Sequence, residues 1–161
     1  MKDEIIKKLS ILTDEELEGN PDVQRRRYSK SGRFIIERRR ISDISTGDQS
    51  APICLRAHPR FSPFPEHTHD YVEIMYVCTG SIVHNIGNKS VSVSAGELLL
   101  LGVNAKHSIR PPSASDIGIN IIISAELFER MLGSLRQDAS INTKYFESLL
   151  DKDVTRHYLF R

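Results

Sequence analysis

The spacing of three ionisable residues in the middle of the chain constrains its fold more than any other feature. Residues 67–80 read His-Thr-His-Asp-Tyr-Val-Glu-Ile-Met-Tyr-Val-Cys-Thr-Gly, so Glu73 follows His67 and His69 at an even spacing. Side chains alternate between the two faces of a strand, so all three point to one face. His107 belongs to a later predicted strand. Divalent metals favour imidazole and carboxylate ligands, so these four residues are candidate metal ligands.

Short strand patterns separated by turn residues dominate the chain from residue 53 to residue 124. Strands are predicted over residues 34–41, 53–58, 71–79, 81–86, 89–94, 97–101, 107–110 and 117–124. Gly80, Gly87-Asn88 and Ala95-Gly96 supply turns, whereas residues 60–66 contain two prolines and are expected to be irregular. Many short strands favour an all-β jelly-roll barrel, which leaves few strand edges exposed.

Helical patterns flank the predicted barrel on both sides. An apolar stripe at helical spacing predicts a helix after residue 2, and Thr13 with Glu16 resembles the capping box of a second one. Residues 1–24 are therefore predicted to be a helical arm and residues 25–124 the barrel. Residues 125–161 are predicted to be a helical dimerisation segment, because the apolar spacing there changes to that of an amphipathic helix. The sequence leaves open whether the N-terminal arm is regulatory or only a lid.

Composition indicates one soluble globular domain. The chain has 161 residues with 39% hydrophobic and 27% charged residues, and its net charge of +1 predicts no general attraction to nucleic acid or membranes. The basic runs 25–27 and 38–40 are expected to lie on a solvated surface. Cys54 and Cys78 lie in apolar runs without a metal-binding or redox motif, and no signal peptide or membrane span is recognisable. These features predict a cytoplasmic protein.

The spacing at residues 67–80 resembles the first sequence motif of the cupin superfamily. That motif is H-x-H, three or four residues, E, six residues and G, and His67, His69, Glu73 and Gly80 match it completely. Cupins usually have a glycine shortly before the histidines, and Phe61 takes that position here. The resemblance implies a cupin barrel, also described as a double-stranded β-helix.

The second cupin motif is matched in part. It reads G, five residues, P-x-G, two residues, H, three residues and N. Gly96 and His107 are kept, but Gly102, Asn104 and Pro111 replace the proline, the second glycine and the asparagine. These replacements are expected to affect the shape of the turn and to leave the ligand set intact.

A narrower resemblance, over residues 53–124, is to the N-terminal sensor domain of AraC-family transcription regulators. Residues 67–80, and residues 96–101 leading to 107–109, carry it. It implies a domain that binds a small-molecule effector, a sugar being one candidate, and forms a homodimer through the helices after the barrel. It also implies DNA binding by a C-terminal helix-turn-helix domain that this chain lacks. The abrupt ending at residues 157–161 leads us to expect a fragment of a longer protein.

Several interior positions are predicted to surround the ligand. Tyr71 and Met75 share the parity of Glu73, and His84 lies on the next strand, so these three are candidate ligand-binding residues with Tyr71 at the barrel mouth. Core packing is the alternative for Met75, and a half-exposed strand position is the alternative for His84. His58 and His157 are expected at the surface.

The metal and the function each have alternatives. Zinc or nickel is the expected ion, and a relic site that forms only a polar pocket floor is the other possibility. Three histidines and a glutamate on iron or manganese would also suit an enzyme, a dioxygenase or a sugar isomerase. Two features count against an enzyme: no further acid–base pair stands near the motif, and the C-terminal helices resemble an interface. A storage-like sugar-binding cupin is a weaker third alternative.

Overall fold

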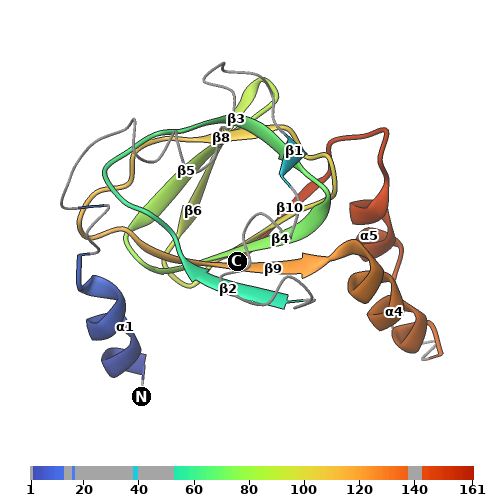
Figure 1. Cartoon of the computed structure of the whole chain (residues 1–161), viewed down its shortest axis with the longest axis horizontal. Helices are drawn as coiled ribbons and strands as arrows, with labels where there is room; N and C mark the ends of the chain where they lie inside the picture. Colours follow the sequence, from blue (N-terminus) through green and yellow to red (C-terminus); the bar gives the residue numbers. More distant parts are fainter. Residues whose placement is uncertain (1, 13–15, 17–37, 40–52, 138–142) are drawn as a thin grey trace.

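Two β-sheets packed face to face form a barrel with helices at its two ends (Figure 1). The computed structural model describes residues 2–12, 16, 38–39, 53–137 and 143–161. Within these ranges, one sheet has the order β1 (Arg38–Arg39), β3 (Phe64–His69), β8 (His107–Ile109), β5 (Ser81–Ile86) and β6 (Lys89–Ser94). The other has the order β10 (His157–Phe160), β7 (Leu98–Leu101), β4 (Tyr71–Thr79), β9 (Ile117–Ser124) and β2 (Ile53–Ala57). The predicted all-β barrel with flanking helices is confirmed.

A strand occupies part of the segment that was expected to be irregular. Residues 60–66 were expected to be irregular, but β3 starts at Phe64 and includes Pro65. The pairing of β3 with β8 changes register between Phe64 and His67. Such an irregularity accommodates a proline, which has no N–H to donate to the neighbouring strand.

The C-terminal segment is helical only in part. Helix α4 (Ala125–Leu135) begins at Ser124, whose hydroxyl accepts a hydrogen bond from the Leu127 N–H, and α5 (Lys144–Glu147) continues into a 3₁₀ turn, η2 (Ser148–Leu150). The prediction of helix as far as residue 161 was wrong, because β10 pairs antiparallel with β7. Tyr158 packs toward the helices and the adjacent Leu159 toward the barrel core, as the two-residue period of a strand requires.

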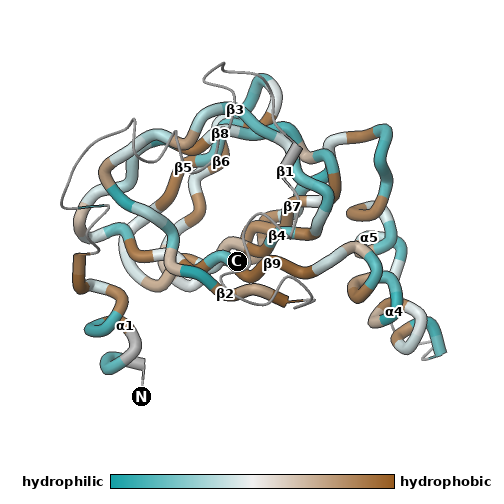
Figure 2. The backbone as a smooth tube through the Cα atoms, in the orientation of Figure 1, coloured by the Kyte–Doolittle hydropathy of each residue, from teal (hydrophilic) through white to brown (hydrophobic). Residues whose placement is uncertain are grey.

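Apolar side chains form two layers on either side of the sheet containing β4, β7 and β9. The inner layer fills the barrel around residues such as Met75, Ile82 and Leu99, which are all fully buried. The outer layer joins the sheet to the C-terminal helices through Phe128 and Leu132. Figure 2 shows that hydrophobic residues concentrate in this sheet, whereas much of β3 is hydrophilic. Strand β3 therefore contributes polar side chains to a barrel that is otherwise mainly apolar.

The N-terminal helix α1 (Lys2–Ser10) is fastened to the barrel by Arg60. The backbone N–H and the guanidinium of Arg60 donate to the carboxylate of Glu16, and the guanidinium also donates to the carbonyls of Ser10, Ile11 and Ala114. Both charged side chains are buried. The predicted first helix is confirmed. The expected second helix and most of the basic runs lie outside the described residues, apart from Glu16 and the two arginines of β1.

Neither cysteine forms a disulfide: Cys54 is half-buried on β2 and Cys78 is buried on β4. This agrees with the reading of both residues as small apolar side chains in strands. None of the helices in the described part of the chain has the length and apolar character needed to cross a bilayer.

Candidate metal and ligand site in the barrel

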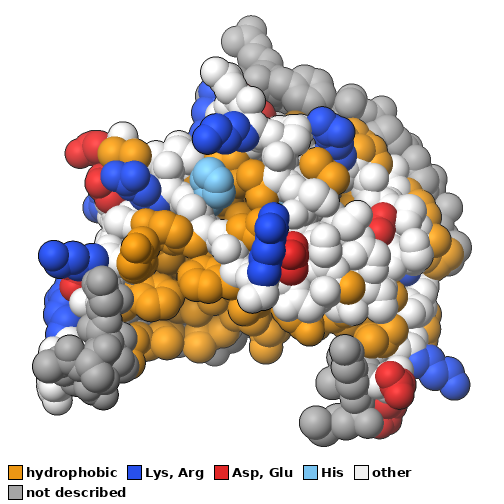
Figure 3. Space-filling model, turned by 180° about the vertical axis from the view of Figure 1, so that it is seen from behind, with side chains coloured by type: hydrophobic (Ala, Val, Ile, Leu, Met, Phe, Trp, Pro, Cys, Tyr) orange, Lys and Arg blue, Asp and Glu red, His pale blue; other side chains and the backbone are white. Residues whose placement is uncertain are grey.

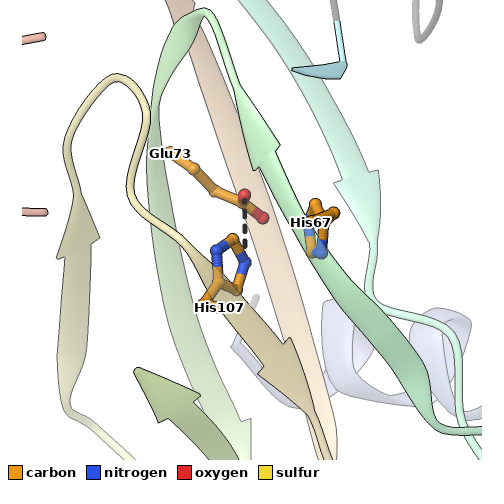
Figure 4. A group of neighbouring side chains, drawn as sticks. All are labelled: His67, Glu73 and His107. Carbon is orange, nitrogen blue, oxygen red and sulfur yellow. Dashed lines mark ion pairs between the residues drawn. The ribbon is translucent and has the colours of Figure 1, made fainter. Parts of the chain in front are cut away.

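Three strands bring the predicted metal ligands together inside the barrel. His67 and His69 come from β3, Glu73 from β4 and His107 from β8, and all four are buried. Pairing of β3 with β8 places His67 directly opposite His107. Figure 4 shows the side chains of His67, Glu73 and His107 pointing toward one another. The parity argument from the sequence therefore agrees with the arrangement in the structure.

The Glu73 carboxylate is the centre of the cluster. The ligand atoms of His67, Glu73 and His107 all lie within 4.8 Å of one another. Oε2 of Glu73 is 3.6 Å from Nε2 of His69 and 4.0 Å from Nε2 of His107. Three of the four predicted ligands thus lie within mutual reach, and His69 approaches the same carboxylate oxygen.

Backbone carbonyls fix the tautomer of all three histidines. Nδ1 of His67 is 2.9 Å from the Pro65 carbonyl, and Nδ1 of His107 is 3.1 Å from the Ala105 carbonyl. Nδ1 of His69 is 2.7 Å from the carbonyl of Tyr71. A carbonyl oxygen can only accept, so each Nδ1 carries the proton and each neutral ring keeps a lone pair on Nε2. This is how metal-ligating histidines are usually oriented in proteins.

The donor set fits a divalent ion. Metal bonds to imidazole nitrogen and carboxylate oxygen are about 2.1 Å long, so ligand atoms around one ion lie up to about 4.2 Å apart. The 4.8 Å limit of the present cluster exceeds that value by only about 0.6 Å. Small side-chain rotations would close the difference. The nitrogen and oxygen donors suit zinc or nickel and equally iron or manganese.

Asn120 completes the surroundings of Glu73 and was not anticipated from the sequence. Its side-chain amide donates to Oε1 of Glu73 over 2.6 Å, which leaves Oε2 directed to the histidines. Asn120 lies on β9 opposite Met75 of β4 and is buried. The available signal was a lone asparagine in the apolar run Ile117–Ser124, because a buried amide needs a polar partner.

The three candidate ligand-binding residues occupy different positions. Tyr71 is 1% exposed, and its ring stacks on the His69 ring at a centroid distance of 4.4 Å, so it supports that histidine instead of lining an open mouth. Met75 is fully buried in the barrel core, as its alternative reading had it. His84 is also fully buried, 5.7 Å from the His107 ring between centroids, so the half-exposed alternative was wrong.

His84 and His58 extend the polar lining away from Glu73. Burial lowers the pKa of His84 well below its usual value, and the nearby His107 and His58 act in the same direction. Burial, followed by the charge of Arg56, lowers the pKa of His58 to about 3. Both rings are therefore neutral at physiological pH, and each can donate and accept one hydrogen bond.

The surface position expected for His58 was wrong. The side chain is 5% exposed, because the face of β2 that carries Cys54 and Arg56 turns inward at its end. The more apolar face, with Ile53 and Leu55, is the exposed one. For His157 the expectation was wrong in part, since that side chain is half-buried.

Two positions at which this chain departs from the cupin motifs have a positive φ. Asn104 stands at the position of the second motif's glycine and keeps a left-handed conformation with φ of 60°. Its N–H donates to the His69 carbonyl over 2.8 Å. Phe61 stands at the position of the first motif's glycine and also has a positive φ, of 69°. The turn of the second motif, which was expected to differ in shape, therefore has a backbone that glycine adopts readily. Asparagine tolerates a positive φ better than phenylalanine does.

Comparison with known proteins identifies the family. Residues 50–157, two thirds of the chain, match the AraC-like ligand binding domain. The chain belongs to this family. The match covers β2 to β9, α4 and α5, and it contains every residue of the cluster described above. The resemblance inferred from the two motifs is thereby confirmed.

Individual relatives agree with this assignment. The AraC-like domain is 30% identical over 81 residues to the HTH-type transcriptional activator RhaR of Escherichia coli strain K12, an alignment that covers 50% of this chain and 28% of RhaR. The chain thus spans less than a third of the length of the curated relatives that it matches.

Two solved structures are similar to parts of the chain. ToxT K231A from Vibrio cholerae is 20% identical, with a TM-score of 0.48, and the match covers 69% of this chain and 42% of ToxT. A Cupin 2 conserved barrel domain protein from Salinispora arenicola is 18% identical, with a TM-score of 0.40, and the match covers 52% of this chain and 73% of that protein.

Proposed function

We propose that this AraC-like domain senses a small molecule inside its barrel and passes the signal to a DNA-binding domain of a transcription regulator. The observation that carries the proposal is the row of buried polar groups in the barrel interior, from Glu73 and Asn120 to His58 and His84. Buried polar groups are costly unless they are hydrogen-bonded, so such an interior favours a polar occupant. Neutral imidazoles and an amide suit the hydroxyl groups of a polyhydroxylated effector such as a sugar.

A divalent ion, zinc or nickel, is part of the proposal. His67, Glu73 and His107 would hold it, with His69 beside them. The ion would supply a Lewis-acidic point to which an oxygen atom of the effector can bind. The fixed Nε2 lone pairs and the hydrogen bond from Asn120 to Glu73 support this assignment, since they orient the donors before any ion arrives.

Thermal unfolding in the presence of candidate effectors tests the sensing role. An effector at 100 times its Kd stabilises the folded domain by about 2.7 kcal/mol, which raises Tm by roughly 5 to 10 °C for a chain of this length. Exchange of His84 for phenylalanine removes both ring nitrogens at similar volume and should reduce the shift. The matched control is His157→Phe on β10. The sensing role is refuted if no compound in a broad panel of sugars and other metabolites changes Tm or the oligomeric state.

We also propose that α4 mediates a homodimer. Met131 and Leu135 lie four residues apart on α4 and are 45% and 37% exposed, while Tyr145 of α5 is 58% exposed. Figure 3 shows a continuous hydrophobic patch on the face turned away in Figure 1, on the side of the molecule that carries α4 and α5. Exposed apolar patches of this kind favour association.

Sedimentation analysis of variants tests the dimer. The double variant Met131→Glu/Leu135→Glu should sediment as a monomer at concentrations at which the unaltered protein is dimeric. Arg130→Glu changes an exposed charge on the same helix and should leave the dimer intact. A dimer that tolerates both glutamates would exclude α4 as the interface.

The remaining parts of the proposal concern the whole regulator. RhaR is named a transcriptional activator, and we propose DNA binding by a helix-turn-helix domain attached to this one. The effector would act by favouring one of two arrangements of the attached domains, which requires different affinity for each arrangement. A cytoplasmic location is consistent with two cysteines that form no disulfide.

A cupin-type enzyme is the competing function, because three histidines and one glutamate also suit iron or manganese. We favour a non-catalytic function, since RhaR, the curated relative reported above, is named a transcriptional activator. Iron-loaded protein should therefore consume no oxygen in the presence of candidate substrates and isomerise no sugar. Sustained turnover by the unaltered protein that is lost in Glu73→Gln would show that the domain is an enzyme and would contradict the proposed sensing function.

A further inference from the structure

A strip of apolar side chains crosses the outer face of the sheet that contains β2, β9 and β4. Strand register aligns two rows of three residues across these strands, Leu55–Ile121–Ile74 and Ala57–Ile119–Tyr76. Directly paired residues share a face, as do residues two apart on one strand. Ile74 and Ile121 pack against the outer apolar layer, so both rows point away from the barrel interior. These six residues, called the apolar strip below, carry no charge.

Two helices border the apolar strip. Helix α4 covers the row next to Leu55, because Phe128 and Leu132 pack on a cluster that includes Ile123. Helix α1 lies at the other end, where Leu9 and Ile117 line the same small cavity. Figure 1 shows the two helices at opposite ends of β2 and β9. Ile117 and Ile123 are six residues apart on β9, or about 20 Å. A helix with its side chains is about 10–12 Å across, so the strip between α1 and α4 is roughly one helix wide.

Much of the apolar strip is accessible. Leu55 is 67% exposed, Ala57 is also exposed, and the other four residues are half-buried. Contiguous apolar surface on a protein commonly marks an interaction site. The strip therefore suits a partner that presents an apolar surface one helix wide.

Helix α4 of a second copy has this shape and chemistry. Phe128 and Leu132 face the sheet of their own copy, whereas Met131 and Leu135 are 45% and 37% exposed. The strip and α4 are neighbours on one surface of the molecule, and a two-fold axis brings the same surface of two copies together. A two-fold axis between α4 and the strip would place α4 of each copy on the strip of the other. The two α4 helices would then lie side by side between the two sheets.

The area that a stable dimer needs favours this arrangement over contact between the helices alone. A standard interface buries about 800 Å² per partner and involves about 20–30 residues a side. Met131, Leu135 and Tyr145 are the exposed large apolar residues of α4 and α5, which is too few for such an interface. The strip adds uncharged residues beside them, as expected for the core of an interface, where charged residues are depleted.

We propose that the apolar strip binds helix α4 of a second copy, with Met131 and Leu135 against Leu55 and Ala57. The inference rests on the homodimer proposed above and names the surface on which α4 lies. It uses only the outer face of the sheet, so it is independent of any metal or effector in the barrel interior.

Cross-linking between copies tests the contact directly. Leu55→Cys and Met131→Cys are prepared as separate proteins, each with Cys54→Ala to remove the half-buried native thiol on β2, while Cys78 is buried. After the two proteins have exchanged subunits, a short bismaleimide should join position 55 of one copy to position 131 of the other. Mass spectrometry of the linked peptides identifies this product. The control uses Val154→Cys in place of Leu55→Cys, because Val154 is 40% exposed but lies between η2 and β10. Its yield of links to position 131 should be at least tenfold lower.

Sedimentation of a strip variant measures what the contact contributes to the dimer. Leu55→Glu places a charge at a position that is 67% exposed, so the fold should be kept and the Kd of the dimer should rise at least tenfold. Val154→Glu makes a similar change at another exposed apolar residue and should leave Kd unchanged. Circular dichroism and thermal unfolding check that both variants are folded.

Two results would overturn the inference and leave the proposed α4 dimer in place. One is an unchanged Kd in folded Leu55→Glu, and the other is a set of cross-links in which position 131 reaches only position 131 of the other copy. An unaltered protein that stays monomeric at millimolar concentration would refute the homodimer itself and the inference with it. The cross-linking result decides the question if Leu55→Glu fails to fold.

Discussion

Replacement of Arg60 by methionine should destabilise the domain far more than breaking an equally short ion pair at the surface. Nε of Arg60 lies 2.8 Å from Oε1 of Glu16, and both side chains are 4% exposed. Nε of Arg136 lies at the same 2.8 Å from Oε1 of Glu147, but these side chains are 51% and 35% exposed. The two pairs share this distance and differ in burial, so Arg136→Met serves as the surface control.

The expected magnitude follows from the charge that Arg60→Met leaves behind. Glu16 would keep a buried carboxylate without its two guanidinium donors, and the carbonyls of Ser10, Ile11 and Ala114 would also lose theirs. Breaking a buried pair in this way costs about 3–5 kcal/mol, whereas an exposed pair contributes about 0–1 kcal/mol. The Glu16 contact raises the pKa of the Arg60 guanidinium, so Arg60 stays charged over the whole practical pH range.

Equilibrium urea unfolding provides the assay. With a slope of about 2 kcal/mol per molar urea, Arg60→Met should lower the midpoint by roughly 2 M and Arg136→Met by less than about 0.5 M. The double variant Arg60→Met/Glu16→Leu should recover part of the loss, because it also removes the carboxylate that has lost its guanidinium donors. The reasoning is refuted if Arg60→Met and Arg136→Met have the same midpoint, or if the double variant is less stable than Arg60→Met.

Two further predictions concern backbone strain and pH. Gly80→Ala should lower the free energy of unfolding more than Gly87→Ala does. Both glycines have a positive φ, which costs alanine about 1–2 kcal/mol. Only at Gly80 would the new Cβ also collide with another residue, Asp116. Equal urea midpoints for the two variants would contradict this. When the pH falls from 7.5 to 5, His58 should lower the free energy of unfolding by about 2 kcal/mol. Its folded-state pKa of about 3 keeps it neutral in the folded protein, whereas the unfolded chain binds a proton there below pH 6.5. In His58→Gln the same pH change should lower the urea midpoint less, and an unchanged pH dependence would exclude His58 as its source.

The barrel and the cluster could be predicted because a period of two residues controls both. His67, His69 and Glu73 share one face of the strand whatever the exact pairing, and the turn glycines set the strand boundaries. His107 could be assigned to the cluster because it lies on a later strand that returns to the same sheet. Local periodicity was therefore sufficient to predict most of the strands and the four residues of the cluster.

Positions that depend on which face of a strand turns inward could not be predicted. Alternation along β2 divided its residues into two sets, but the more apolar set, with Ile53 and Leu55, is the exposed one. His58 was consequently expected at the surface. The partners of Glu73 and Arg60 could not be predicted either, because they are distant in sequence. Asn120 lies 47 positions from Glu73, and Glu16 lies 44 positions from Arg60. The strand at residues 157–160 is fixed by pairing with β7, and no local signal specifies that contact.

Elemental analysis of the protein purified without a nickel affinity step tests the central claim most directly. The metal centre formed by His67, Glu73 and His107 predicts about one divalent ion per chain in the unaltered protein and in the control His157→Gln. Glu73→Gln keeps the size of the side chain but removes its charge, and it should reduce the content below about a tenth of an ion. A folded, metal-free protein that takes up no zinc or nickel on titration would contradict the account.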